Sequence, residues 1–510
     1  MKPATGLLIT GISILFIRGQ YQYSISRDRK CQQYIGSHGN IEITQEDDSV
    51  FCFHQHLYQS ALDASPTDAM LLYIRELLWK SLSRCHGNGS EEWRQWLTKE
   101  KVCNNGTCRM EERRINICKK GQNESKTKAT TSKGCRMNNA DNGNSNNTCE
   151  VRRTNHTKAE KKAHHCSWIR KEVRAMNRSE WTQFVNRLNI LKEAIPVRGH
   201  RSFVPYDVIS DLHRSNESLH SSHGGPNFLG WHRMYLLLLE AAIGVPIPYW
   251  DSRLDYDMTD PTDSILWTSE FFGPGFGLED SGPFANWKTP DNESLVRNIG
   301  NNGSLVSSDM VKTILRYRRH SRAVEPILNS IEDIHEGPHR WVDGQMSSLE
   351  TAPQDPIFFL HHSFIDYIWY MFRKKLRKRG EINPALDYPC KGPESHHSYA
   401  TMFPYGNLPN IYGYSDHLES LTHYVPSPKC PDCGNSAYLY CDHGIRRCKS
   451  KAVTAQTSNI RNEKIKKIRY RIRAIGIIHL GRKFELHIID QRTRGDTLTF
   501  LPLIDRVVNV

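Results

Sequence analysis

Several features are absent from this 510-residue sequence, and each absence excludes something. No stretch after the first 20 residues reaches the roughly 18 uninterrupted apolar residues of a membrane-spanning helix, so we expect no membrane anchor. Residues 119–165 contain no Phe, Trp or Tyr and cannot bury enough apolar surface to fold, which predicts a polar, glycosylated linker. No cysteine occurs from 167 to 389, so that part must fold without disulfide bonds. No internal repeat or heptad pattern is evident, so repeat folds are not expected.

The 14 cysteines are concentrated on both sides of that gap, with nine from Cys31 to Cys166 and five from Cys390 to Cys448. This usage is typical of a protein that folds in an oxidising compartment and whose flanks are held by disulfide bonds. The last four cysteines, at 430, 433, 441 and 448, could form a zinc knuckle in place of disulfide bonds. The sequence alone does not give their pairing.

The N-terminus predicts secretion. Lys2 is followed by an apolar stretch from Leu7 to Ile17 and then by small and polar residues, as in a signal peptide ending near residue 19. Nine N-x-S/T sequons suit the same route. They are Asn88, Asn105, Asn123, Asn146, Asn155, Asn177, Asn216, Asn292 and Asn302.

The formal net charge of +13 invites a nucleic-acid interpretation. No interleaved aromatic residues and no nucleic-acid-binding motif accompany the basic residues, and secretion argues against such a partner. We therefore expect a solvated basic surface, with attraction to acidic partners possible.

Two groups of histidines carry the chemistry. His335 and His339 are four residues apart, which places them on one face of a helix, and His362 follows inside a second helix opened by Asp355-Pro356. Upstream, a short helix starting at Pro205 is predicted to carry His213, and a helix over about 228–242 carries His232. His223 stands nine residues before His232, at the end of a loop. Two groups of three histidines predict a dinuclear metal site that could hold copper, zinc, iron or nickel.

The blocks that carry these histidines are HGGPNFLGWHR (223–233) and HEGPHRW…DPIFFLHHSFIDYIW (335–369). IPYWDSRLD, LWTSEFFG, GPFANW and VRNIGNNGSL lie between them. Together they resemble the two copper motifs of the tyrosinase family of type-3 copper proteins, in wording most similar to secreted mollusc and flatworm members. The resemblance covers about residues 167–430.

The resemblance implies a cofactor of two copper ions and a four-helix bundle around them. It assigns His213, His223 and His232 to the first copper. It assigns His335, His339 and His362 to the second and leaves His361 a neighbour. The implied activity is O2-dependent conversion of monophenols to o-diphenols and of o-diphenols to o-quinones.

Rival interpretations exist for single motifs. His220 could replace His223 on spacing alone. His335-Glu336-Gly337-Pro338-His339 also spells HExxH, the zinc-peptidase motif, but that motif needs an uninterrupted helix and Pro338 argues against one. The zinc reading also leaves the other matching blocks unexplained.

Three further residues receive roles. Glu336 stands where many phenol-hydroxylating relatives carry Asn, and we expect it to position a water or to disturb that step. Arg340 matches a position at the substrate entrance, where it could attract a carboxylate such as that of tyrosine. Asp366, four residues after His362, could accept the free N–H of a ligand imidazole or pair with an arginine.

The predicted fold class is mainly α, with an N-terminal disulfide-rich module and a small β-rich C-terminal extension. One helix is predicted through LLYIRELLWKSL, and a β-hairpin from YRIRAIGIIHL and KFELHIID. The expected partners are phenols or catechols, O2 and tyrosine-rich extracellular proteins. A catechol oxidase without the hydroxylation step, a hemocyanin-type oxygen carrier and an inactive relative remain the alternatives. The predicted segments are a signal peptide (1–19), Cys-rich module (20–118), linker (119–165), dicopper domain (166–425) and extension (426–510).

Overall fold

The computed structural model describes residues 45–65, 67–83, 167–324, 328–380, 382–389, 391–453, 475–480 and 483–488. The predicted signal peptide, the linker and the sequons at 88, 105, 123, 146 and 155 lie outside these ranges. The longer helices are α2 (Gln45–Ala64), α3 (Ala69–Leu82), α7 (Arg178–Lys192), α10 (Asn227–Ile243), α14 (Ile331–Val342) and α15 (Ile357–Arg379). The shorter ones are α8 (Pro205–Asp211), α9 (Asn216–Ser222), α11 (Arg253–Tyr256), α12 (Ser308–Ile314), α13 (His320–Val324) and α16 (Asp416–Ser420).

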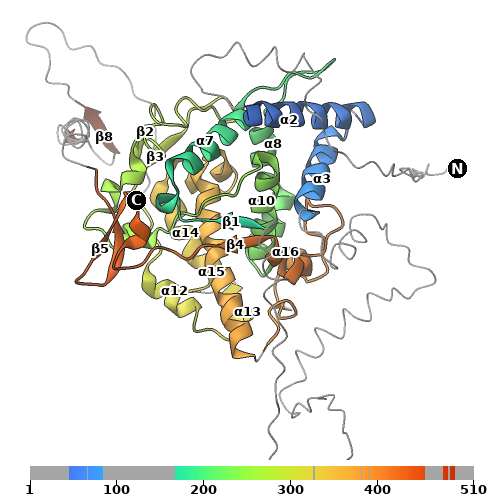
Figure 1. The fold of residues 1–510 in the computed structure, drawn as a ribbon. Coiled ribbons are helices and arrows are strands. Elements are labelled where there is room, and N and C mark those ends of the chain that lie inside the picture. Colours follow the sequence, from blue (N-terminus) through green and yellow to red (C-terminus); the bar gives the residue numbers. More distant parts are fainter. Residues whose placement is uncertain are drawn as a thin grey trace, which may run out of the picture.

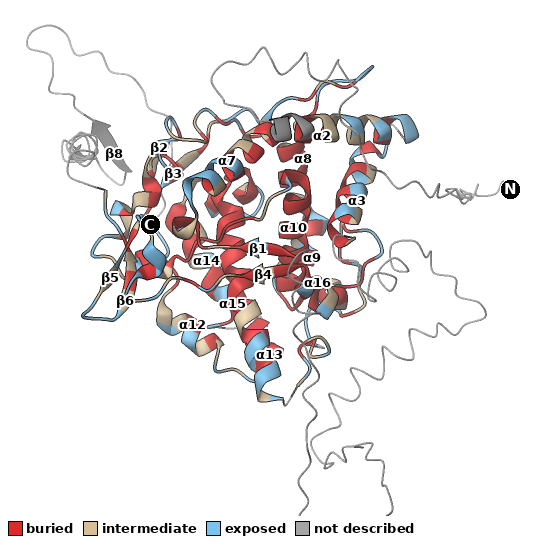
Figure 2. Cartoon of the chain, viewed as in Figure 1, coloured by how far each residue is buried: buried red, intermediate tan, exposed pale blue. Residues whose placement is uncertain are grey.

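Helices α10, α14 and α15 occupy the centre of the molecule (Figure 1). Every residue of α10 is buried, because its sequence NFLGWHRMYLLLLEAAI has apolar residues on all sides. The first 13 residues of α15, Ile357–Trp369, are buried as well, and Figure 2 shows the central helices largely in the colour of buried residues, with exposed residues toward the end of α15. The mainly α class predicted from the sequence is confirmed.

The strands are short and form two-stranded sheets within the described ranges. β1 (Trp168–Arg170) runs parallel to β4 (Thr422–Tyr424), so the start of the core is joined to its end. The other pairs are antiparallel: β2 (Phe276–Leu278) with β3 (Val296–Asn298), β5 (Leu439–Asp442) with β6 (Arg447–Ser450), and β7 (Ile475–Leu480) with β8 (Lys483–Ile488). The last pair is the predicted hairpin.

A buried network of charges joins β1 to the two central helices. The Arg170 guanidinium donates to both oxygens of Glu240 on α10 at 2.8 Å and to Asp366 on α15 at 3.2 Å. Arg233 donates to the other oxygen of Asp366 at 2.8 Å, and the Tyr424 hydroxyl donates to Asp366 at 2.6 Å. All the charged side chains are at most 4% exposed, so each charge depends on its partner for compensation.

The N-terminal helices belong to the same core. One helix was predicted here, and the structure has two, because α2 also buries one face through Val50, Phe51 and His54. The His54 imidazole lies between the Ala242 carbonyl (3.0 Å) and the Tyr73 hydroxyl (2.8 Å). This part of the predicted Cys-rich module therefore packs directly against α10 instead of standing apart.

The C-terminal cysteines form two disulfide bonds, Cys430–Cys441 and Cys433–Cys448. Three of these cysteines also form a group of metal-ligand spacing, but sulfurs bonded to each other are not free to bind a cation. The disulfide prediction is confirmed over the zinc knuckle. None of the helices in the described ranges combines the length and apolar character needed to cross a bilayer.

Replacing Arg170 tests whether the buried network holds the core together. An Arg170→Met variant leaves Glu240 buried without its cation, so we expect a loss of about 3–5 kcal/mol in the free energy of unfolding. Urea denaturation of the copper-free protein measures it. The exposed Arg201 is the control, since Arg201→Met should change stability by less than about 0.5 kcal/mol. Equal losses in both variants would show that the buried network does not contribute to the free energy of unfolding beyond what a surface arginine does.

Candidate metal centre

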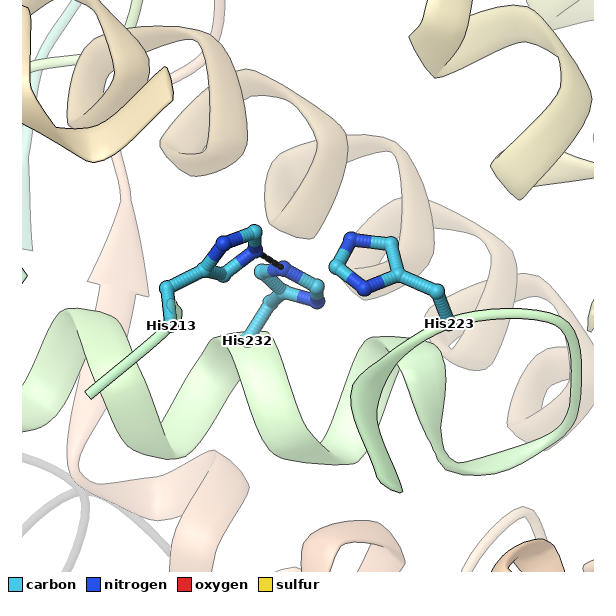
Figure 3. A group of neighbouring side chains, drawn as sticks. All are labelled: His213, His223 and His232. Carbon is cyan, nitrogen blue, oxygen red and sulfur yellow. Dashed lines mark hydrogen bonds between the residues drawn. The ribbon is translucent and has the colours of Figure 1, made fainter. Parts of the chain in front are cut away.

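The first histidine cluster comes from one helix and the ends of two others. His232 lies on α10, His223 follows the last residue of α9, and His213 lies two residues beyond the end of α8. The expectation that a short helix carries His213 is therefore wrong, because α8 ends at Asp211 and a turn follows. One nitrogen from each imidazole lies within 4.8 Å of the others, and Figure 3 shows the three rings pointing at one another. The closest approach is 3.4 Å, between Nε2 of His213 and Nε2 of His232.

The second cluster lies between α14 and α15. His335 and His339 lie one turn apart on α14, and Nε2 of His339 is 3.1 Å from Nε2 of His362 on α15. The two clusters touch, since the rings of His232 and His362 stack with their centroids 4.3 Å apart. The six predicted ligands are thus brought together. Four of them lie on the three helices α10, α14 and α15, and His213 and His223 lie just beyond the ends of α8 and α9, so the ligands do not come from four helices as expected.

Backbone carbonyls fix the orientation of four of the rings. Nδ1 of His213 lies 2.7 Å from the Leu349 carbonyl oxygen, and Nδ1 of His232 lies 2.8 Å from that of Phe228. On the second cluster, Nδ1 of His335 and of His339 lie 2.8 and 2.9 Å from the carbonyl oxygens of Glu332 and Met346. A carbonyl only accepts, so each Nδ1 carries the proton and each Nε2 is left with a free lone pair.

This protonation pattern fits a metal. Two Nε2 lone pairs that face each other at 3.4 Å (His213 and His232) repel unless a cation lies near both. Burial and the neighbouring imidazoles lower the pKa of His213 to about 3, and burial lowers that of His339 to about 4. These rings are therefore neutral at pH 7, as metal ligands must be.

His361 and His362 compete for the last ligand position. One nitrogen from each of His335, His339 and His361 lies within 4.8 Å of the others, whereas the resemblance assigns His362. Nε2 of His361 lies 2.9 Å from the His335 carbonyl oxygen, so this nitrogen donates there and only Nδ1, which has no hydrogen-bond partner among the described residues, could bind a metal. Nε2 of His362 instead points at Nε2 of His339. We therefore favour His362.

The fold and this site define a mainly helical protein with a dinuclear histidine centre. Residues 204–375 match the family model described as the common central domain of tyrosinase. The putative tyrosinase-like protein tyr-3 of Caenorhabditis elegans is 34% identical over 306 residues, covering 55% of this chain and 43% of that protein. Tyrosinase-like protein 1 of Margaritifera margaritifera is 35% identical over 281 residues, covering 49% and 55%.

A tyrosinase of Streptomyces lincolnensis is 30% identical over 197 residues, which cover 33% of this chain and 70% of that protein. The chain belongs to the tyrosinase family. This family has a type-3 site with two copper ions, and the two histidine clusters could hold them. The chain spans about half the length of the nematode and pearl-mussel relatives.

The zinc-peptidase interpretation of the HExxH motif is not supported, but the helix break expected at Pro338 is not the reason. Pro338 lies inside α14 and does not interrupt it, so the expected helix break is wrong. The Glu336 side chain, which would be the general base of a zinc peptidase, is 51% exposed and forms an ion pair with Arg340 at 2.5 Å. His335 and His339 face the histidines of the other helices instead.

A pocket of about 540 Å³ opens onto both clusters. Imidazoles of His213, His223, His335 and His339 lie on one side of it. The rest of the wall combines apolar residues with charged and hydroxyl side chains, and the rim is exposed at Leu328 (79%) and Leu349 (50%). The apolar lining consists of Leu328, Met346, Leu349, Ala352 and Phe358.

Glu332 contributes a buried carboxylate to this pocket that was not predicted from the sequence. Glu332 is buried, its Oε1 accepts the Gly224 N–H at 2.6 Å, and its Oε2 is buried with no protein partner among the described residues. Burial, with some help from Glu336, raises its pKa to about 8. The sequence did contain a hint, since Glu332 precedes His335 by three residues and so shares its helix face.

The contacts of Arg340 and Asp366 differ from the roles that the sequence suggested for them. Arg340 lines the pocket as predicted, but its ion pair with Glu336 means that it does not offer an uncompensated charge to a substrate carboxylate. Asp366 binds Arg170, Arg233 and Tyr424, so of its two predicted roles the structure shows the arginine pair and not a bond to a ligand imidazole. Nε2 of His396 lies 2.8 Å from the His223 carbonyl oxygen and supports that loop.

Paired variants of the two adjacent histidines test the ligand assignment. His362→Gln should lower the copper content from about two ions per chain to about one, because it removes a lone pair that points at the second cluster. His361→Gln should retain about two, since a glutamine amide can still donate to the His335 carbonyl. Metal analysis after copper loading and gel filtration measures both. The reverse result would make His361 the ligand.

Glu332→Gln tests the buried carboxylate. Glutamine keeps an oxygen for the Gly224 N–H but cannot take up a proton, so at a pH above about 8, where Glu332 is ionised, we expect L-tyrosine hydroxylation to fall by about 10²-fold or more. Oxidation of L-DOPA should fall much less. Oxygen-uptake rates with the two substrates, at equal copper content, measure the split. A parallel fall in both rates would contradict a role specific to the phenol.

Proposed function

We propose that this chain is a copper oxidase that converts o-diphenols to o-quinones and hydroxylates monophenols such as tyrosine. The observation that carries the proposal is the open pocket on the histidine clusters. Its volume of about 540 Å³ falls within the range of small-molecule sites, and its rim is exposed. An oxygen carrier has no use for such an opening, because O2 is far smaller than the pocket.

The reaction balances with O2 as the oxidant. Two o-diphenols give up four electrons and four protons to one O2, which yields two o-quinones and two waters. In the hydroxylation, one oxygen atom enters the phenol ring and the other leaves as water, with two electrons supplied by a diphenol. The copper pair supplies the redox and O2 chemistry when bound.

The protein's own part is binding, orientation and proton transfer. The Phe358 ring stacks on His362 with centroids 4.0 Å apart and presents an apolar wall to an incoming aromatic ring. When Glu332 is ionised, above its pKa of about 8, its unpartnered Oε2 could accept a hydrogen bond from a substrate hydroxyl or a water, which would orient the hydroxyl for deprotonation. The Glu336–Arg340 pair lies at the mouth, where its effect on ring chemistry should be small.

A catechol oxidase without the monophenol step is the second candidate. The feature that favours this alternative is Glu336, which replaces the Asn of many hydroxylating relatives. Its exposure and its pairing with Arg340 place its carboxylate outside the buried part of the pocket. Glu332 therefore supports the tyrosinase proposal, because it offers a carboxylate inside.

We also propose that the enzyme acts outside the cell. The predicted signal peptide, the sequons and the two C-terminal disulfides support secretion. The asparagines of the four described sequons, at 177, 216, 292 and 302, are exposed, as glycosylation requires. Quinones formed there would make pigment or cross-link tyrosine-rich extracellular material such as shell, cuticle or eggshell.

Oxygen uptake by the mature, copper-loaded protein is the decisive measurement. Given L-tyrosine and a trace of L-DOPA to remove any lag, we expect uptake well beyond what the L-DOPA can consume. Uptake with L-DOPA alone would instead identify a catechol oxidase. Reversible O2 binding without oxidation of either substrate would identify a carrier. A chain that retains less than about one copper ion would contradict the dinuclear site itself.

A further inference from the structure

A dense group of basic side chains lies where the end of α15 packs against the segment that leads into α13. We define the α13–α15 basic surface by residues of these two segments that are exposed, except Arg379, which is half-buried. Its members are Arg316, Arg318, Arg319, Arg322, Lys374, Lys375, Lys378 and Arg379.

Direct contacts make this surface continuous, although its two segments are about 55 residues apart in the sequence. Nη1 of Arg379 donates to the Tyr317 carbonyl at 2.6 Å, and Nζ of Lys375 to the Leu315 carbonyl at 3.4 Å. The His320 ring packs on Phe372 with centroids 5.2 Å apart, which holds α13 against α15. Figure 1 shows α13 beside the end of α15 at the lower edge of the molecule.

The carboxylates among the described residues compensate only part of this surface. Asp387 lies 3.4 Å from Arg319, and Asp416 pairs with Arg377 at 2.7 Å, on the neighbouring side of α15. No carboxylate in the described part of the chain pairs with Lys374, Lys378 or Arg322. The surface therefore carries a large excess of positive charge.

Helix stabilisation explains only part of this excess. Cations in the last turn of α15 interact favourably with its dipole, which accounts for Lys378 and Arg379. The arginines of 316–322 belong to another segment and gain nothing from that dipole. Bringing them beside the lysines of α15 adds repulsion, which an anionic partner would remove.

We propose that the α13–α15 basic surface binds a sulfated polysaccharide. The run RKKLRKR (373–379) has the density of basic residues typical of heparin- or nucleic-acid-binding patches. Arg373 is buried and Arg377 pairs with carboxylates, so Lys374, Lys375, Lys378 and Arg379 are the residues of this run that remain available. The aromatic residues beside it, Tyr317 and Tyr370, are half-buried, so the surface offers no exposed ring on which a base could stack. A linear polymer that carries only charged groups suits such a surface, since its binding is driven by release of counterions.

The bound polymer would leave the copper pocket open. Sixteen residues of α15 separate His362 from Lys378, which corresponds to about 24 Å along the helix. A polysaccharide on this surface would therefore hold the protein in an extracellular matrix without covering the site. The inference goes beyond the catalytic proposal and does not depend on it.

Heparin is the probe for the test, with the mature, copper-loaded chain. The triple variant K374Q/K375Q/K378Q should bind at least about tenfold more weakly at physiological salt. The slope of log Kd against log salt should become shallower by about two to three, since three contacts are lost. The control R198Q/R201Q/K391Q removes the same charge from exposed positions outside the surface and should change Kd by less than about threefold.

Three outcomes would overturn the proposal. The first is an equal loss of heparin affinity in the control, which would mean that net charge alone matters. The second is duplex DNA that binds as tightly as heparin with the same dependence on the three lysines, which would make the surface unselective. The third is equal binding of hyaluronan, which carries carboxylates but no sulfates. Oxygen uptake by the variants stays a separate measurement, so a failure here is distinguishable from a failure of the proposed activity.

Discussion

The buried ion pairs around Asp366 determine how the two central helices face each other. Arg233 follows His232 directly on α10, and Asp366 lies one turn beyond His362 on α15. Their contact at 2.8 Å therefore sets the relative height of the two helices beside the stacked imidazoles of His232 and His362. Arg170 completes the arrangement from β1 by binding Glu240 and Asp366 together. Charges buried this deeply tolerate little displacement, because each would lose its only compensation.

The six histidines proposed as copper ligands illustrate what a sequence can and cannot predict. The spacing of His335 and His339 and the family motifs identified the six histidines, and the structure brings all six together. Local pattern failed at Pro338, because a proline was assumed to end the helix, whereas α14 continues to Val342. It failed again at α2, whose packing partners lie almost 190 residues away on α10. The pairing of Arg340 with Glu336 and the burial of Glu332 depend on which residues share a helix face and what covers it. Spacing alone did not reveal either.

The surrounding protein must hold several buried, neutral imidazoles close together. Burying imidazoles lowers their pKa, which keeps them neutral but leaves lone pairs facing one another at short distances. The fold holds this unfavourable arrangement by means of surrounding contacts, including the Phe358 ring on His362 and the His396 contact with the His223 carbonyl. A metal ion relieves the repulsion, so metal binding and the stability of the core are coupled.

Four ligand rings are oriented by carbonyl oxygens of the main chain, a group that every amino acid supplies. Three of those carbonyls belong to Glu332, Met346 and Leu349, whose side chains line the pocket. At these positions the main chain orients an imidazole of the proposed metal site, while the residue's side chain lines the pocket. Evolution can therefore vary the shape and polarity of the pocket by substitutions here without altering the contacts that orient the ligands. Divergence of substrate preference and constancy of the metal centre are compatible at the same three residues.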